Sequence, residues 1–242
     1  MKTTLQNIFL AMIFFPLASC AQWDLNKINK TIKDNTGFTK PLSNGEIVDG
    51  LKEALTIGSR NSSASASKTD GYFKHPVIKI PFPKEAKEME QKLRSIGMGK
   101  QVDEFVMTLN RAAEEAAKES APIFVTAVKQ MTITDGVKIL KGKDDEATQY
   151  LVRTTSPELK NKFKPVIKSA IQKVDVTRYW SPLINAYNRI PFVQKMNPDL
   201  EEYVTGKALE GLFYLVAQEE LKIRKDPVAR VTELLKKVFG NN

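Results

Sequence analysis

Residues that commonly carry out chemistry are scarce in this chain of 242 residues. Cys20 is its only cysteine and His75 its only histidine, so a Cys–His or Ser-His-Asp mechanism would have to use these single copies. One histidine also argues against zinc, because a closed zinc site needs several His, Cys or carboxylate ligands. The nucleophile elbow and the glycine-rich phosphate and dinucleotide loops do not occur. The sequence therefore predicts no catalytic residue, no metal site and no cofactor.

His75 precedes Pro76 in the segment "HPVIKIPFP" (75–83), where we interpret it as a structural or exposed imidazole. Pro76, Pro81 and Pro83 each restrict the backbone of the preceding residue, so this segment cannot be helical. We expect an extended, Pro-rich apolar strap that lies across the helices of the fold.

The densest run of carboxylates lies in "KGKDDEATQYL" (141–151), at Asp144, Asp145 and Glu146. Their oxygens could hold a divalent cation, but the run lacks the ligand spacing and central glycine of an EF-hand loop. Acidic residues also stabilise the positive end of a helix dipole, so the start of a helix explains the same run. The sequence leaves open whether residues 142–149 bind a cation.

Two further pairs of adjacent carboxylates are Glu114 with Glu115 and Glu219 with Glu220. Adjacent residues on a helix point in different directions, whereas an acid–base pair must converge on one substrate. Solvated helix faces explain both pairs better. A hydrolase or lyase that uses carboxylates alone is therefore the least favoured class of function.

The position of Cys20 predicts where the protein resides. Residues 1–19 combine Lys2, an apolar run from 8 to 17 and small residues before the cysteine, which is the layout of a secretory signal. The run is too short to span a bilayer as a stable helix. The string "LASC" (17–20) resembles the lipobox of bacterial lipoproteins, in which the signal is removed and the cysteine is acylated. We therefore expect Cys20 to be the lipid attachment site, with more than one acyl chain for stable anchoring.

Ala21 bears on the destination of this anchored chain. An aspartate at that position would indicate retention in the inner membrane of many Gram-negative bacteria, so its absence favours the outer membrane. No dense acidic run follows Cys20, which favours the periplasmic face, although the sequence leaves surface exposure open. Residues 20–42 are polar and weakly patterned, and we interpret them as a tether to a domain formed by residues 43–240.

The chain is basic, with a formal net charge of +9, and a basic surface attracts anions. Outside the cytoplasm the available anions are lipid head groups and acidic envelope components, so we expect no nucleic-acid partner. Lys160, Lys164 and Lys168 are spaced by four residues beside an apolar arc, which places them in one stripe on a helix. This stripe is either a solvated flank or a contact with an anionic membrane surface.

Helical periodicity from residue 43 onward predicts an all-α fold, a compact multi-helix bundle. Ser43 and Glu46 predict a capping box, and residues 60–71, rich in small polar side chains, predict a loop or a frayed helix end. Later helix starts are predicted at Thr132 with Asp135, Ser156 with Pro157, Asn197 with Pro198, and Asp226 with Pro227. The helix from Pro198 to about Lys225 is expected to be central to the core through Leu200, Tyr203, Val204, Ala208, Leu212, Phe213 and Val216.

Several long strings in these helices resemble the bacterial DUF4197 family. They include "GLKEALTIGSRN", "KQMTITDGVKILKGKDDEATQYL" and "NPDLEEYVTGKALEGLFYLVAQEELKIR", and the similarity covers roughly residues 42–240. The resemblance implies one compact helical domain in a secreted or lipoprotein-like chain. It implies no catalytic residue, because the family has no established activity.

These observations favour a non-enzymatic interaction or scaffold module, held at the outer membrane through its acylated N-terminus. Its partner would be an envelope protein or an anionic lipid. The alternative is a periplasmic carrier that binds an apolar ligand, such as a lipid, in a helical cavity. The sequence names neither the partner nor the oligomeric state.

Overall fold

The computed structural model describes residues 43–172 and 199–226, together with the isolated positions 180, 185, 188, 189, 191, 192 and 195. The predicted signal (1–19), Cys20, the tether (20–42) and the helix expected after Asp226 lie outside the described residues. The described elements are α2 (Asn44–Ser67), η1 (Lys84–Ala86), α3 (Lys87–Ser95), α4 (Gly99–Ala116), η2 (Ala117–Glu119), α5 (Ser120–Gln130), α6 (Ile133–Lys141), α7 (Glu146–Ile171) and α10 (Leu200–Lys225). All of them are helices, which confirms the all-α prediction.

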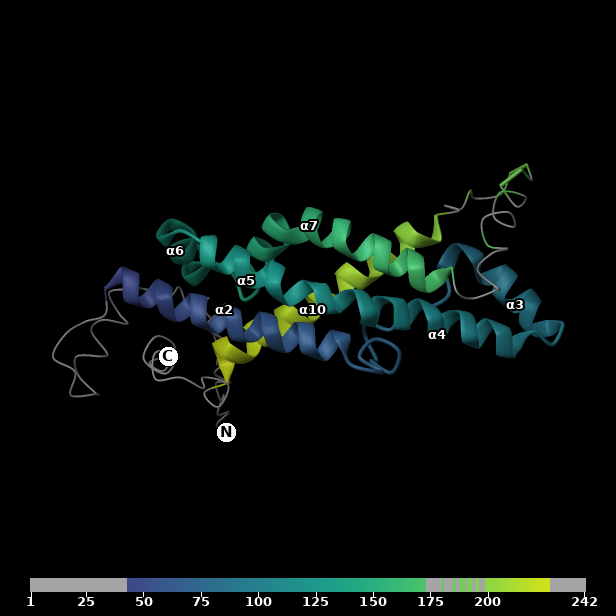
Figure 1. Cartoon of the computed structure of the whole chain (residues 1–242), viewed down its shortest axis with the longest axis horizontal. Helices are drawn as coiled ribbons and strands as arrows, with labels where there is room; N and C mark the ends of the chain where they lie inside the picture. The colour runs from purple at the N-terminus through teal and green to yellow at the C-terminus, as the bar shows by residue number, and fades with distance from the viewer. Residues whose placement is uncertain are drawn as a thin grey trace, which may run out of the picture.

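The long helices run side by side in an elongated bundle (Figure 1). α10 packs against both α7 and α2, and α4 packs against α7, so α10 connects the two sides of the bundle. α6 lies at one end of the bundle and α3 at the other (Figure 1). Within the described part of the chain, no helix is both long enough and apolar enough to cross a bilayer.

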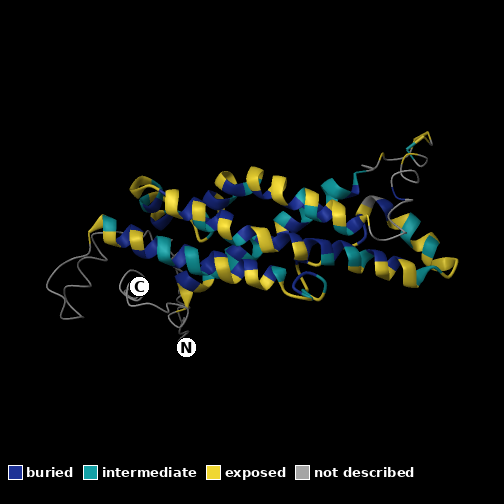
Figure 2. Ribbon diagram, viewed as in Figure 1, coloured by how far each residue is buried: buried dark blue, intermediate teal, exposed yellow. Residues whose placement is uncertain are grey.

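Each long helix turns its apolar stripe inward, and Figure 2 shows buried residues on the facing sides of the ribbons. The expected core face of α10 is largely confirmed, because five of its seven side chains are buried: Leu200, Val204, Ala208, Leu212 and Val216. Tyr203 and Phe213 are only partly buried, and Phe213 meets the ring of Phe124 edge-on at 5.8 Å. The expectation is therefore wrong for these two residues, which lie at the border of the buried stripe.

The loop or frayed helix end predicted for residues 60–71 is wrong over its first part, because α2 continues as a regular helix to Ser67. Ser62 and Ser63 bond to the carbonyls of Gly58 and Ser59, and both side chains are buried. The Ser120 hydroxyl bonds in turn to the Ser63 hydroxyl at 2.8 Å. Hydroxyls that bond to their own helix hide their polarity, so a serine-rich stretch can remain helical and pack closely.

The helix start predicted at Ser156 is also wrong, because α7 runs unbroken from Glu146 to Ile171. The Ser156 hydroxyl bonds back to the Val152 carbonyl at 2.6 Å instead of capping a new helix. Pro157 and Pro165 both lie inside α7. Packing of α7 against α4, α5 and α10 outweighs the local signal for a break.

The predicted caps have mixed outcomes. Ser43 with Glu46 forms the predicted capping box, and the helix start predicted at Thr132 with Asp135 is confirmed and is also a complete capping box. α10 begins later than predicted, since its cap is Asp199, whose side chain accepts from the Glu202 N–H at 2.9 Å.

Residues 68–83, called the connector below, join α2 to η1 without forming a helix. The segment 75–83 contains no helix, as its prolines predict, but it is not extended throughout as expected, because residues 76–78 form a turn. Ile78, Ile80 and Phe82 in it are buried. Phe82 packs against Phe105 and Trp180, whose rings stack at 5.6 Å. The connector is thus part of the core on one side.

Candidate binding groove between the connector and α10

The start of the connector is held by a buried carboxylate. Oε1 of Glu114 on α4 accepts from the backbone N–H groups of Tyr72 and Phe73, at 3.1 Å each. Arg111 donates to Glu114 Oε2 and to Asp70 Oδ1, both at 2.6 Å. Glu114 is 4% exposed, so the prediction of a solvated face is wrong for this residue. Its charge is compensated by an arginine and by backbone dipoles, as a buried carboxylate requires.

The middle of the connector is held by an amide. Oδ1 of Asn110 accepts from the Ile80 N–H, and Nδ2 donates to the Ile80 carbonyl, both at 2.8 Å. Asn110 is fully buried, and its Nδ2 also donates to the Val106 carbonyl. The side chain therefore pairs with both polar groups of one connector residue, which satisfies a non-helical backbone inside the core.

His75 also serves the connector backbone. Its Nδ1 accepts from the N–H groups of Val77 and Ile78, at 3.2 and 3.3 Å, and its ring meets Tyr214 edge-on at 6.1 Å. Because Nδ1 accepts, the proton of the neutral imidazole lies on Nε2. The structural interpretation of His75 is confirmed by this geometry.

Tyr72 fastens the connector to α10. Its hydroxyl donates to the Ala208 carbonyl at 2.6 Å, and burial, with a smaller contribution from Glu114, raises the pKa of this hydroxyl well above its usual range. Gly211 allows the close approach, because a Cβ there would lie 2.7 Å from Tyr72 Cε1 and 3.0 Å from Ile78 Cβ. The connector consequently lies directly on the α10 backbone at this point.

Beside this contact lies a groove with a cavity volume of 440 Å³. One wall comes from the connector and the start of η1, through Val77, Ile78, Lys79, Pro81 and Lys84; the other comes from α10, through Tyr203, Lys207, Glu210, Gly211 and Tyr214. The α10 residues recur at three- and four-residue steps, so they form one face of the helix. From Tyr203 to Tyr214 this face extends about 16 Å, at 1.5 Å per residue.

The groove lining is apolar at Ile78, Pro81 and Gly211, called the floor below, and basic at Lys79, Lys84 and Lys207, called the rim. Lys207 is paired with Glu210 at 2.5 Å. Lys79 lies over the ring of Phe73, with Nζ 4.7 Å from the centroid. Among the described residues, neither Lys79 nor Lys84 has a carboxylate partner, and both side chains are exposed. The rim therefore carries two positive charges that no described carboxylate neutralises.

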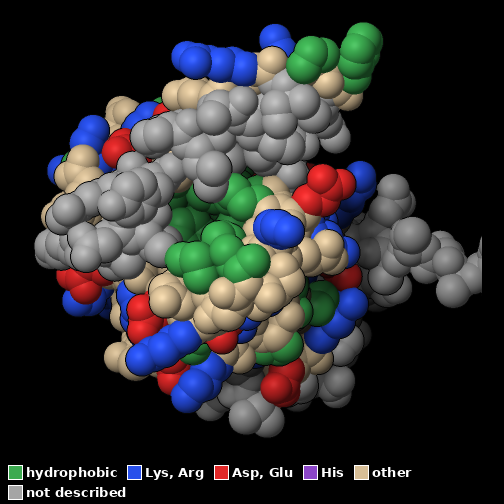
Figure 3. Space-filling view, turned by 90° about the vertical axis from the view of Figure 1, so that its right-hand side faces the viewer, with side chains coloured by type: hydrophobic (Ala, Val, Ile, Leu, Met, Phe, Trp, Pro, Cys, Tyr) green, Lys and Arg blue, Asp and Glu red, His purple; other side chains and the backbone are tan. Residues whose placement is uncertain are grey.

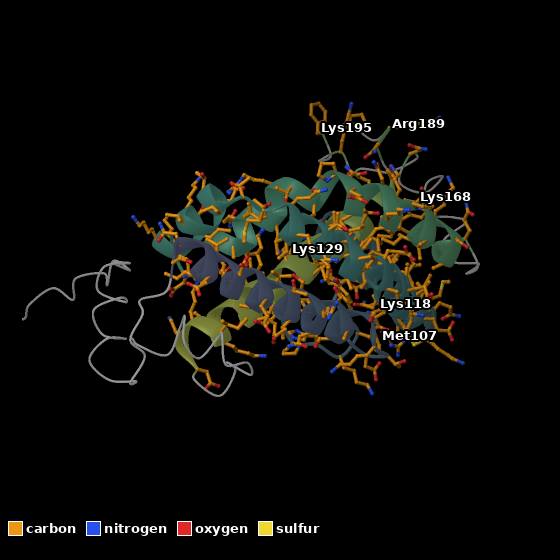
Figure 4. The ribbon with its side chains drawn as sticks, turned by 60° about the vertical axis from the view of Figure 1, so that its left-hand side comes forward. Met107, Lys118, Lys129, Lys168, Arg189 and Lys195 are labelled. Carbon is orange, nitrogen blue, oxygen red and sulfur yellow. The ribbon has the colours of Figure 1, made fainter. Side chains whose placement is uncertain are left out.

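The predicted lysine stripe on α7 has a different environment. Lys160 pairs with Glu202 at 2.5 Å, Lys164 with Glu202 and Asp199 at 3.5 and 3.7 Å, and Lys168 with Glu201 at 3.5 Å. Figure 4 shows Lys168 on α7. The hydrogen bond from Lys160 lowers the pKa of Glu202 below its usual range. The stripe thus faces the acidic first turn of α10, and its contact with an anionic surface stays a prediction.

The acidic run before α7 is partly paired as well. Asp144 bonds to Lys225 at 3.0 Å, and Asp145 accepts from the Gln149 side chain at 3.1 Å. The described residues contain no group of three or more His, Cys, Asp or Glu side chains placed to hold a metal ion. The geometry of residues 142–149 favours a helix start over a cation site.

A second buried carboxylate caps that helix from α10. Glu220 accepts from the N–H groups of Ala147 and Thr148, at 3.0 and 2.8 Å, and from the Thr148 hydroxyl at 2.7 Å. It also pairs with Arg224 at 2.8 Å, and both side chains are about 5% exposed or less. The solvated-face prediction is wrong for Glu220 too, because this glutamate neutralises the N-terminal dipole of α7.

An apolar area lies at the end of the bundle formed by α3 and the start of α4. Figure 3 shows hydrophobic side chains gathered there among charged ones. Ile96, at the end of α3, is 60% exposed. The nearby Arg94 is already paired with Glu90 and Asp103, so the groove is the stronger candidate site.

A family model described as "Protein of unknown function (DUF4197)" matches residues 41–240. No curated protein and no solved structure matches the chain.

Proposed function

Because the chain belongs to the DUF4197 family, for which no function is described, we propose a role from the chemistry of the groove. The protein is a non-enzymatic docking module of the cell envelope, and the groove between the connector and α10 is its docking surface. One observation carries this proposal: two exposed lysines, which no described residue pairs with a carboxylate, lie on the rim of a groove with two tyrosines. Tyrosine is enriched at protein interfaces, where its ring is buried and its hydroxyl finds a partner.

Preorganisation of the groove supports the proposal. The connector wall is fixed by Glu114, Asn110 and Tyr72, and the Tyr203 hydroxyl donates to the Pro81 carbonyl at 3.2 Å. A surface that is already ordered loses little conformational entropy when a partner binds. The buried polar contacts are therefore useful to docking as well as to stability.

The location forms part of the proposal. Acylation of Cys20 would hold the domain at the outer membrane, on its periplasmic face, through the tether of residues 20–42. The lipobox-like string at 17–20 supports this placement. Cys20→Ser is expected to move the protein out of the membrane fraction or to stall removal of the signal. An unchanged fractionation together with an unchanged N-terminal mass would contradict the anchor.

Site-specific crosslinking in native membranes tests the docking surface. A photoreactive amino acid replaces Val77 on the groove wall in one variant and Ile133 on α6 in the matched control, since both side chains are 58% exposed. We expect one discrete protein adduct from position 77, absent from position 133, and lost when Lys84→Glu is added. Identical adduct patterns from the two positions would reject the groove as the docking surface.

A second candidate function is a carrier for an apolar ligand, which is favoured by the aliphatic side chains of Val77, Ile78 and Pro81 in the groove. Mass spectrometry after mild detergent extraction separates the two functions. A lipid that copurifies in a one-to-one ratio, and is lost in Val77→Asp, would support the carrier. Crosslinking of position 77 to lipid and not to protein would lead to the same conclusion.

A further inference from the structure

We infer that the groove receives an extended, acidic peptide segment of another envelope protein. This inference rests on the proposed docking function and names the chemistry of the partner. Carboxylates of the segment would lie beside Lys79 and Lys84, and its alternate apolar side chains would lie along the floor between Tyr203 and Tyr214.

The first argument is charge complementarity. The rim carries Lys79, Lys84 and Lys207 against the single carboxylate of Glu210, and that carboxylate is already paired with Lys207. The whole chain has the same sign, with a net charge of +9. An acidic segment is attracted by both, whereas a basic segment would meet like charge, which suppresses wrong partners.

The second argument is shape. The α10 face of the groove extends about 16 Å from Tyr203 to Tyr214, at 1.5 Å per residue. An extended peptide advances about 3.3 Å per residue, so about five residues would fill it. Successive side chains of such a peptide point to opposite sides, which suits one apolar floor and one basic rim.

The third argument is the distribution of the cations. A site for a single phosphate gathers several donors at one point, commonly from a helix N-terminus or from arginines. Here Lys79 lies over the Phe73 ring and Lys207 is drawn to Glu210, so the ammonium groups are spread along the rim. A ligand with several separate charges matches this arrangement better than one compact anion.

Fluorescence polarisation tests the inference on the full chain in detergent. The probe is a labelled peptide of alternating glutamate and leucine, and its counterpart carries glutamine in place of glutamate. The double variant Lys79→Glu with Lys84→Glu is expected to weaken binding of the acidic probe at least tenfold. The glutamine peptide should bind weakly to every form, and added salt should weaken the acidic probe through screening.

A matched control separates the groove from net charge. Lys118→Glu with Lys129→Glu changes the net charge by the same amount, on η2 and α5 (Figure 4). This control is expected to leave the affinity within about twofold, because its positions do not line the groove. The second groove variant, Lys79→Ala with Lys84→Ala, should give a smaller loss than the double reversal. Circular dichroism melting curves establish that every variant is folded.

Several results would overturn the inference. One is an equal loss of affinity in the groove and control variants. Another is displacement of the bound acidic probe by inorganic phosphate or by phosphatidylglycerol vesicles, at concentrations at which the glutamine peptide does not displace it. If position 77 crosslinks a protein in membranes while the acidic probe is insensitive to the groove reversal, the docking function stands and the acidic partner is rejected.

Discussion

The two sides of α10 differ in whether the lysines beside them are neutralised by carboxylates. Towards α7, every lysine of the predicted stripe meets a carboxylate in the first turn of α10, and Glu220 near the other end caps α7. Towards the connector, a 440 Å³ groove lies beside Lys79 and Lys84, whose charges no described carboxylate neutralises. The same helix is thus held by ion pairs on one side, and on the other side it lines the groove that we propose as the docking surface. A lysine-rich string therefore does not indicate a binding surface until its partners are known.

The largest expected effect is on the α7 side. Glu220→Gln should destabilise the fold by about 3–5 kcal/mol, because it removes the buried negative charge that faces Arg224 and the N–H groups of Ala147 and Thr148. Denaturant unfolding measures this cost. The matched control is Glu219→Gln, whose more exposed carboxylate contacts Asn61 and Lys222. Comparable losses of unfolding free energy in the two variants would show that burial of Glu220 with Arg224 adds no stability beyond that of an exposed contact.

The next effect concerns the contact between the connector and α10. Gly211→Ala should cost about 1–3 kcal/mol, since its Cβ would crowd Tyr72 and Ile78 in a packed core. Gly206→Ala is the control on the same helix, because nothing lies within 4 Å of its added Cβ. Alanine is favoured over glycine in a helix by about 1 kcal/mol, so this control should raise stability. Thermal unfolding of both variants would test the difference in sign.

A smaller effect separates the two lysine sets by stability alone. Lys160→Glu with Lys164→Glu places like charges beside Asp199 and Glu202 and should cost about 1 kcal/mol, the scale of exposed ion pairs. Lys79→Glu with Lys84→Glu should change the unfolding free energy little, because these lysines have no described carboxylate partner to lose. A larger loss of unfolding free energy for Lys79→Glu with Lys84→Glu would show that these two lysines, and not those of α7, stabilise the fold through ion pairs.

The smallest effect is the pH dependence of the α7 side. The hydrogen bond from Lys160 lowers the pKa of Glu202 from its ordinary value of 4.5. A lowered folded-state pKa means that the stabilisation is complete above pH 4.5 and is lost as the pH falls below it. Lys160→Met should therefore reduce the loss of stability in acid. If the unfolding free energies of the variant and the wild type fall in parallel below this pH, the hydrogen bond from Lys160 to Glu202 does not cause the loss.

Much of the fold was predictable because helix stripes and capping boxes are local signals. Ser43 with Glu46 and Thr132 with Asp135 could be read directly from spacing. Ser156 with Pro157 gave the same kind of signal, but the predicted helix start was wrong. α7 packs along its whole length, and the Ser156 hydroxyl bonds back to the Val152 carbonyl. Local propensity fails where tertiary packing is stronger.

The candidate site could not be predicted, because its key residues act across long distances in sequence. Glu114 reaches Tyr72, and Asn110 reaches Ile80, from a helix on which neither stands out. Adjacent glutamates gave no indication of which one is buried. A glycine inside a strong helix pattern often marks a close approach, but Gly206 and Gly211 carry this signal alike and only Gly211 lies against the connector.

Thiol labelling tests the central claim, that the connector side of α10 is occupied in the envelope. Cys20 is the only cysteine, so under the proposed acylation an introduced thiol is the only one of this chain that reacts. Maleimide labelling of Val77→Cys should slow at least tenfold in intact envelopes relative to the purified chain, and Lys79→Glu with Lys84→Glu should restore it. Ile133→Cys, equally exposed, should label alike in both samples. Equal labelling of Val77→Cys in envelopes and in the purified chain would contradict the account.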